Sequence, residues 1–303
     1  MAEPDATPLP PDVTEATRNP AIKDLRSRIR EHRDAFSPAA QTVCRTLSAI
    51  TPEHLLYASA SELGAQTRTS NATVIRTLQS LGYSGLAELK GLVAGPFSTA
   101  VAPEVRARRR MESTGGDLQE VWNRVTAESI DRIELLRRNF SLERYEAAVH
   151  MLLEAREIAT FGFGASFVAA DHMALKLRRS GRRSRSMNAA GFRLADELLG
   201  IERGDVVVLF TPGRLLNDVE AVLDRARSVG ANSILVTDEL VGRLDDVVSV
   251  TLHAPNTPTG LTGEPLTSMV LADALTQGVA TSDMERTVEA SHTLTTVRQQ
   301  LGF

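Results

Sequence analysis

Cysteine is almost absent from this 303-residue sequence: Cys44 is the single one, so no disulfide can form within the chain. No apolar run approaches the ~18 residues of a membrane span, and the first residues lack the basic-then-apolar order of a secretion signal. The six histidines show no metal-ligand spacing, and no Cys/His cluster accompanies them. We therefore expect a cytoplasmic protein without a metal ion or other cofactor.

The composition, 42% hydrophobic and 24% charged, is that of a soluble globular protein long enough for two domains. Its net charge of −4 is unevenly distributed. Residues 21–110 contain 13 Lys and Arg against 7 Asp and Glu, a balance of +6, which leaves −10 on the remainder. A basic N-terminal region followed by an acidic remainder favours a DNA-binding module attached to another domain.

Residues 58–90 contain the pattern of two short helices separated by a polar turn. Ser59, with Glu62 three residues later, is a capping-box pattern and predicts a helix from residue 60. Ser70 can cap a second helix that runs to about Leu81 and that Gly82 ends. A short helix, a tight turn and a second helix are the order of a helix-turn-helix.

The second helix combines an apolar face with a set of hydrogen-bonding side chains. Val74, Leu78 and Leu81 recur at helical spacing and predict the buried face. The other faces hold donors suited to DNA bases and phosphates. The predicted DNA-binding residues are Ser70, Asn71, Thr73, Arg76, Thr77 and Ser80. On pattern alone, a helical hairpin within an ordinary all-α bundle fits equally well.

The segment ASASELGAQTRTSNATVIRTLQSLGYSGLAELK resembles the N-terminal domain of RpiR/MurR-type transcriptional regulators. The positions that carry the resemblance are Glu62-Leu63-Gly64, Ser70, Thr73-Val74, Arg76 and Leu81 to Leu86. The resemblance implies that this helix-turn-helix binds double-stranded DNA. Gly64 stands where the family usually has Ala, and glycine weakens a helix by roughly 1 kcal/mol.

The pattern predicts four regions along the chain. Residues 1–20 read as a disordered, Pro-rich tail, residues 21–96 as an all-α helix-turn-helix bundle and residues 97–116 as a linker. The linker contains Arg106, Arg108, Arg109 and Arg110. Residues 117–303 read as a ligand-binding domain that begins with two helices.

After residue 156 the pattern alternates between strands and helices. The strongest strand, Asp205 to Phe210, is a continuous apolar run of the kind that is buried on both faces of a parallel sheet. The other predicted strands are 157–161, 185–187, 233–237 and 247–252. Together they predict an α/β domain with an open, mainly parallel five-stranded sheet flanked by helices.

Ligands of such sheets bind beyond the carboxyl ends of the strands. Two loops should lie there: FGFGAS after the first strand and TPGR after the third. Glycines allow close backbone approach, and a helix beginning at Ser166 offers free N–H groups to an anion. The dinucleotide fingerprint is incomplete because its third glycine is missing. Two ordinary strand-to-helix turns are the alternative.

Residues 158–280 resemble a SIS (sugar isomerase) domain, through FGFGASFVAADHMALKLRRSG, RGDVVVLFTPGR and DRARSVGANSILVTD. The resemblance implies phosphosugar binding by hydroxyl residues of the first and third loops, here Ser166 and Thr211. SIS domains usually carry Ser-x-Ser-Gly-x-Thr in the third loop, so two hydroxyls are missing and Arg214 has appeared. Either Arg214 replaces them as a charged clamp, or the ligand is not a phosphosugar.

These observations predict a DNA-binding transcriptional regulator, a homodimer or homotetramer, whose SIS domain binds a small anionic metabolite. The expected effector-binding residues are Gly162, Gly164, Ala165, Ser166, Thr211, Gly213, Arg214 and Glu264. One alternative is a sugar-phosphate isomerase with a helical appendage, in which Glu264 would be the base. Another is a SIS binding module whose front domain only drives assembly. We expect no enzymatic activity.

Overall fold

The computed structural model describes residues 19–32, 36–98, 107–108, 110–111, 116–211, 213 and 215–303. The chain divides into two compact units. The first contains residues 1–131 together with 258–261, and the second contains residues 132–257 and 262–303. The first unit therefore includes the beginning of a helix that we expected to belong wholly to the second domain. The expected tail lies mostly outside the described residues.

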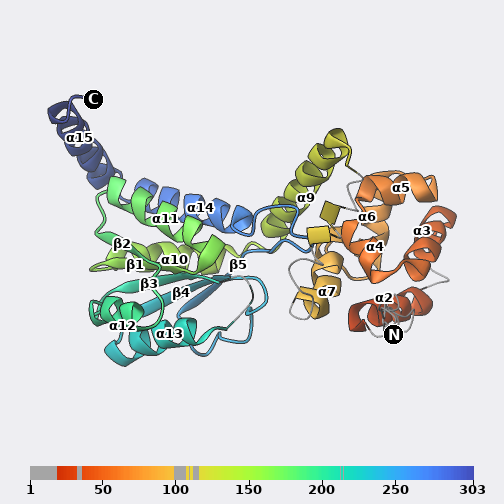
Figure 1. Cartoon of the computed structure of the whole chain (residues 1–303), viewed down its shortest axis with the longest axis horizontal. Coiled ribbons are helices and arrows are strands. Elements are labelled where there is room, and N and C mark those ends of the chain that lie inside the picture. Colours follow the sequence, from red (N-terminus) through yellow and green to blue (C-terminus); the bar gives the residue numbers. More distant parts are fainter. Residues whose placement is uncertain are drawn as a thin grey trace, which may run out of the picture. The chain divides into compact units, whose positions relative to one another are not determined.

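The described part of the first unit is helical (Figure 1). Its helices are α2 (Pro20–Glu31), α3 (Pro38–Ala49), α4 (Pro52–Tyr57), α5 (Ala60–Thr67), α6 (Asn71–Ser80), α7 (Leu86–Ser98) and the start of α9 (Leu118–Arg138). Three of them begin with Pro behind a side-chain cap, namely Asn19, Ser37 and Thr51. Proline suits that position because its missing N–H would have no partner within the helix.

Apolar side chains from α2 to α7 meet in one core. The fully buried members include Leu25, Leu47, Leu63, Leu78 and Leu89, one from each of five helices. Cys44 is buried in this core as a small apolar side chain. The core holds α5 and α6 in place, so their outer faces are fixed by the bundle beneath them.

The second unit is an α/β domain with an open parallel sheet. After the end of α9 come α10 (Leu142–Glu154), β1 (Ile158–Gly162), a 3₁₀ helix η2 (Gly164–Ser166), α11 (Phe167–Arg179), β2 (Ser184–Met187) and α12 (Phe192–Leu199). Then follow β3 (Val206–Phe210), α13 (Asn217–Val229), β4 (Asn232–Thr237), β5 (Val250–His253), α14 (Leu266–Ser282) and α15 (Met284–Gln300). The strand order is β2-β1-β3-β4-β5, and every pair is parallel.

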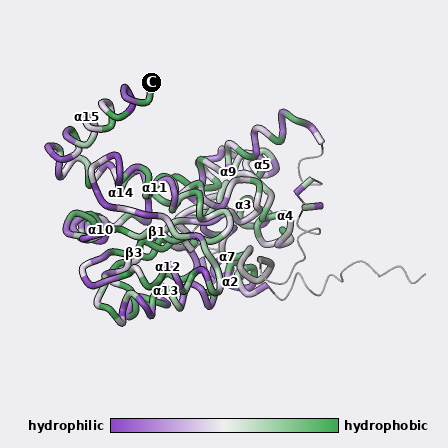
Figure 2. The backbone as a smooth tube through the Cα atoms, turned by 60° about the vertical axis from the view of Figure 1, so that its left-hand side comes forward, coloured by the Kyte–Doolittle hydropathy of each residue, from purple (hydrophilic) through white to green (hydrophobic). Residues whose placement is uncertain are grey.

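Alternate residues of the strands enter two separate cores. Val206, Val208 and Phe210 pack with α10, α11 and α14, whereas Val207 and Leu209 pack with α12 and α13. The sheet therefore has helices on both faces (Figure 1), and the hydrophobic colour of its central strands agrees with burial on both sides (Figure 2). The predicted fold class is confirmed.

Two helices of this unit add details that were absent from the sequence expectation. Helix α12 was not predicted. Helix α15 has no buried residue among its side chains. Among the described residues, no helix combines the length and apolarity required to cross a membrane.

Candidate DNA-binding surface and effector site

The capping box predicted at the start of α5 is present. The backbone N–H of Glu62 donates to Ser59 Oγ at 3.1 Å, and the N–H of Ser59 donates to Glu62 Oε2 at 2.7 Å. The helix ends at Arg68, which has left-handed φ and ψ of 53° and 40°. A non-glycine residue in this conformation marks a turn fixed by its surroundings. The turn leads directly into α6, as in a helix-turn-helix.

Gly64 has a role in packing that cannot be inferred from the helix propensity of glycine. A Cβ atom at this position would stand 2.9 Å from the carbonyl oxygen of Thr69 and 3.2 Å from Asn71 Oδ1. The absence of a side chain thus lets the turn and the first residue of α6 pack directly against α5. The departure from the family's alanine therefore does more than loosen the helix.

Helix α6 presents a polar outer face. Ser70 caps it, accepting from the N–H of Thr73 at 3.2 Å, and its hydroxyl lies 2.9 Å from the Thr73 hydroxyl. Asn71, Arg76 and Ser80 are exposed, while Val74 and Leu78 are buried, which agrees with the predicted apolar face. The exposed side chains supply amide, guanidinium and hydroxyl donors.

Thr77 does not belong to this exposed surface. It is buried, and its hydroxyl donates to the carbonyl of Thr73 at 2.8 Å, so it faces the bundle rather than solvent. Thr77 precedes the buried Leu78 and follows Val74 by three residues, which places it on the core side of the helix. Gln79, which we did not predict, is exposed three residues after Arg76. That spacing was the available signal for it.

In the second unit, the two predicted loops leave neighbouring strands at the same edge. Gly162 at the end of β1 lies in register with Phe210 at the end of β3. Ser166 follows β1 and Thr211 follows β3. Both residues are buried, at 6% and 7% exposure. The structure therefore brings the β1 and β3 loops together at the carboxyl edge, where such sheets bind ligands.

The β1 loop is compact because it contains two glycines. A Cβ on Gly162 would stand 2.6 Å from the carbonyl oxygen of Ser166, and Gly164 has a φ of +57°. Gly164, Ala165 and Ser166 form η2, so the regular helix begins one residue later than predicted, at Phe167. The loop still leads into the amino end of α11.

The β3 loop lies next to an acidic residue, Glu239, that we did not predict. A Cβ on Gly213 would lie 2.7 to 2.8 Å from the carboxyl group of Glu239, so this carboxylate lies against the loop. Glu239 comes two residues after β4, the next strand of the sheet, and reaches the same edge. Arg214, the expected charged clamp, lies outside the described residues.

Glu264 lies in the loop between β5 and α14. Its carboxylate is exposed, and its carbonyl oxygen accepts a hydrogen bond from Arg132 Nη2 at 3.0 Å. His172 on α11 lies with Nε2 2.8 Å from Oδ1 of Asp273 on α14. Within the part of the chain that the structure describes, no three His, Cys, Asp or Glu side chains are grouped to hold a metal ion.

Known proteins are similar to this chain in its SIS region and over most of its length. The SIS domain family profile matches residues 151–277. Bifunctional protein glk of Burkholderia thailandensis is 28% identical over 210 residues, which are 69% of this chain and 32% of that protein. The chain thus spans about a third of the length of these curated relatives. HTH-type transcriptional regulator YbbH of Bacillus subtilis, itself uncharacterized, is 24% identical over 78% of this chain and 83% of its own length.

A solved structure shows the same fold. The NanR protein of Vibrio vulnificus, complexed with ManNAc-6P, superposes with a TM-score of 0.53 at 19% identity. The alignment covers 91% of this chain and 98% of NanR. The chain therefore carries a SIS domain at residues 151–277 and has HTH-type transcriptional regulators among its relatives, as the resemblance to the RpiR/MurR type implied.

Proposed function

We propose that this protein is a transcriptional regulator that binds double-stranded DNA through α6 and a small anionic metabolite through its SIS domain. The observation that carries the proposal is the outer face of α6. Asn71, Arg76 and Gln79 are exposed on a helix whose opposite face is buried in the bundle. Asn and Arg can each form two hydrogen bonds with a purine edge in the major groove.

The SIS domain supplies the second half of the proposal. Ser166 and Thr211 lie at the carboxyl ends of adjacent strands, and the amino end of α11 adds backbone N–H groups to that edge. These groups suit a phosphate, and NanR, which shares the fold, holds a phosphosugar. The Glu239 carboxylate lies against Gly213 in the β3 loop, so a ligand at this edge would also meet an acidic side chain.

We further propose that the protein acts as a homodimer or homotetramer, since a symmetric operator is read by a symmetric protein. An effector would favour one of two arrangements of the DNA-binding domains and so change operator affinity. The isomerase alternative would use Glu264 as its base. The carboxylate of Glu264 is exposed to solvent, whereas catalytic bases are tuned by burial and close neighbours. The proposal includes no catalytic step.

The test is binding of the full chain to duplex DNA. Selection from genomic fragments followed by titration at several salt concentrations should give an operator whose affinity falls steeply with salt. Arg76→Ala should weaken operator binding by about 1–3 kcal/mol if Arg76 contacts a base. Arg45→Ala removes another exposed arginine, from α3, and serves as the matched control. Salt-independent binding, or turnover of sugar phosphates, would reject the proposal.

A further inference from the structure

Helix α9 carries three charged side chains on one face. Arg124, Glu128 and Arg132 are spaced four residues apart and so lie one above another along the helix. Glu128 is 5% exposed and Arg132 is 1% exposed, while the side chain of Arg124 is 15% exposed. Buried charges are retained only when they are paired or hydrogen-bonded. We call these three residues the α9 stripe.

Arg132 holds the loop between β5 and α14 at both of its ends. Its Nε and Nη2 donate to the carbonyl of Pro255 at 3.2 and 3.0 Å. Its Nη1 donates to Thr262 Oγ1 at 2.8 Å and to the carbonyl of Gly263 at 2.7 Å, and Nη2 also reaches the carbonyl of Glu264. All five guanidinium N–H donors are therefore directed at residues 255–264. We call these residues the β5–α14 loop.

Glu128 contacts the middle of the same loop. Its carboxylate accepts a hydrogen bond from the hydroxyl of Thr259, which in turn accepts from the N–H of Leu261 at 3.0 Å. Glu128 also interacts electrostatically with the buried ammonium of Lys90 on α7. Glu128, which contacts the middle of the loop, and Arg132, which contacts its ends, are thus one turn apart on α9.

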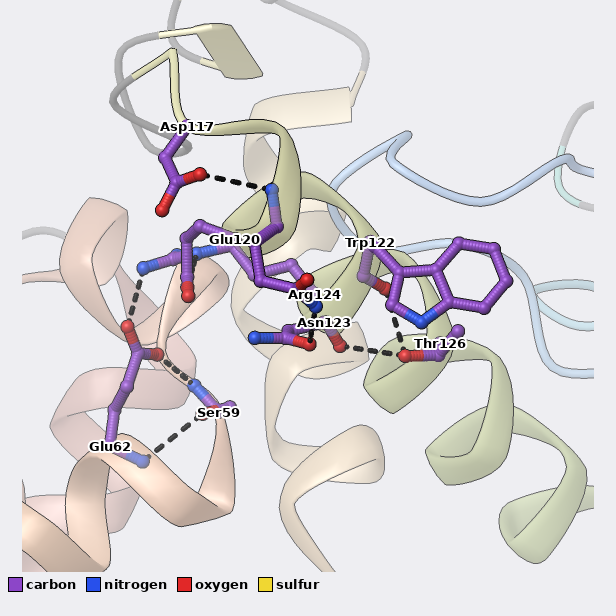
Figure 3. Close-up of polar contacts among 9 residues, drawn as sticks. Ser59, Glu62, Asp117, Glu120, Trp122, Asn123, Arg124 and Thr126 are labelled. Carbon is purple, nitrogen blue, oxygen red and sulfur yellow. Dashed lines mark hydrogen bonds and ion pairs between the residues drawn. The ribbon is translucent and has the colours of Figure 1, made fainter.

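Arg124 connects α9 to the beginning of the helix-turn-helix. It forms ion pairs with Glu62 and with Glu120, the latter at 2.6 Å. Glu62 is the capping-box residue, and its other oxygen accepts from the N–H of Ser59 (Figure 3). Figure 3 shows Arg124 directed toward Glu62, while Trp122 points away from this group. A change at Arg124 therefore acts on Glu62, whose carboxylate forms half of the capping box of α5.

The α9 stripe also borders the places where the chain passes between its two units. The passages are at residues 131–132, 257–258 and 261–262. Glu128 and Arg132 flank the first passage, and their hydrogen-bond partners flank the other two. Each of these hydrogen bonds lies within a single unit. Covalent continuity along α9 and the loop is thus what joins the two sets of contacts.

We propose that the α9 stripe couples the β5–α14 loop to the capping box of α5. Arg132 and Glu128 are positioning residues for the loop that carries Glu264, and Arg124 passes a change in α9 to Glu62. A ligand that favours a different loop arrangement would alter the partners of Glu128 and Arg132, and so bias the start of the helix-turn-helix. The regulatory meaning of this coupling rests on the proposed function.

Amide hydrogen exchange of the full chain, without DNA or ligand, tests the coupling. Arg132→Met removes the loop contacts, and Thr259→Val removes the hydroxyl that reaches Glu128. Both variants should speed exchange in the loop and, at least about fivefold, at residues 59–67. Arg144→Met is the matched control, because Arg144 donates to the carbonyl of Thr251 at 3.2 Å within the second unit. The control should leave residues 59–67 unchanged.

The inference is overturned if loop exchange rises in the variants while residues 59–67 exchange as in the wild type. Thr259→Val keeps the test valid should Arg132→Met fail to fold, since valine is close to threonine in volume. Duplex binding, measured on the same proteins, separates this result from the proposed function. If exchange shows the coupling but the protein does not bind DNA, the proposed regulatory function is rejected and the coupling stands. If the protein binds DNA but shows no coupling, only the role proposed for the α9 stripe is rejected.

Discussion

Gly162 approaches Ser166 so closely that a Cβ atom on Gly162 would stand 2.6 Å from the Ser166 carbonyl oxygen. The contact is with backbone, which cannot rotate away as a flexible side chain can. Gly162→Ala should therefore displace η2 and lower the free energy of unfolding by about 1–3 kcal/mol. Urea unfolding would measure this. Gly263→Ala is the control, since its nearest neighbour would lie at 3.6 Å, and an equal loss there would contradict the explanation.

Gly64 and Gly91 lie in helices of the same unit but differ in the space around them. Alanine gains roughly 1 kcal/mol over glycine within a helix. At Gly91 a Cβ would meet nothing within 4 Å, so Gly91→Ala should raise the free energy of unfolding by about 0.5–1 kcal/mol. At Gly64 the Cβ would stand 2.9 Å from the Thr69 carbonyl, and the clash should outweigh the gain. Equal stabilisation by both substitutions would show that the turn can move freely.

Lys90 should make stability depend on pH. Burial lowers the pKa of its ammonium from 10.5, against the opposing attraction of Glu128, Asp131 and Glu62, while Arg124 adds to the lowering. The folded chain therefore binds this proton less tightly than the unfolded chain, so the stability contributed by Lys90 increases as the pH rises toward 10.5.

Comparison with Lys90→Met isolates this effect. The unfolding free energy of the wild type minus that of the variant should increase between pH 7 and pH 9.5, by about 1.4 kcal/mol for each unit of pKa difference at most. Chemical unfolding at both pH values would measure it. Parallel pH profiles of the two proteins would mean that the attraction of Glu128, Asp131 and Glu62 fully offsets the effect of burial on the pKa of Lys90.

We expect Ser166 and Thr211 to bind the phosphate group of an effector rather than its sugar. Each hydroxyl that bonds a phosphate oxygen contributes about 1.5–3 kcal/mol, so Ser166→Ala and Thr211→Val should each weaken phosphosugar binding tenfold or more. Thermal shift with N-acetylmannosamine 6-phosphate and its unphosphorylated sugar would show the difference. Ser228→Ala, on the surface of α13, is the control. Unchanged affinity in both loop variants for a phosphate-dependent ligand would place the site elsewhere.

Local signals in the sequence predicted much of this architecture. The capping box of Ser59 and Glu62 and the continuous apolar strand β3 depend on residues adjacent in the chain, and both were predicted within a residue or two. Thr77 shows where the same reasoning was incomplete. Its position next to Leu78 already placed it on the core side of α6, yet its hydroxyl suggested a DNA contact.

Features that depend on distant partners could not be predicted. The charges of Arg124, Glu128 and Arg132 have the spacing of an ordinary solvated helix face, and only tertiary structure shows that Arg132 bonds residues more than 120 positions away. Glu239 likewise reaches Gly213 only because β3 and β4 are neighbours in the sheet. Sequence reasoning therefore located the edge of the effector site but not the carboxylate that lies against it.

The pairing of Gly162 with Phe210 sets a length scale for recognition. Adjacent strands lie about 4.8 Å apart, so the β1 and β3 loops begin one strand spacing from each other. Two hydrogen bonds of about 2.8 Å, one from each loop, together reach slightly farther than that interval. One compact tetrahedral group can thus bridge the two loops, and the remainder of a ligand is free to vary without disturbing that anchor.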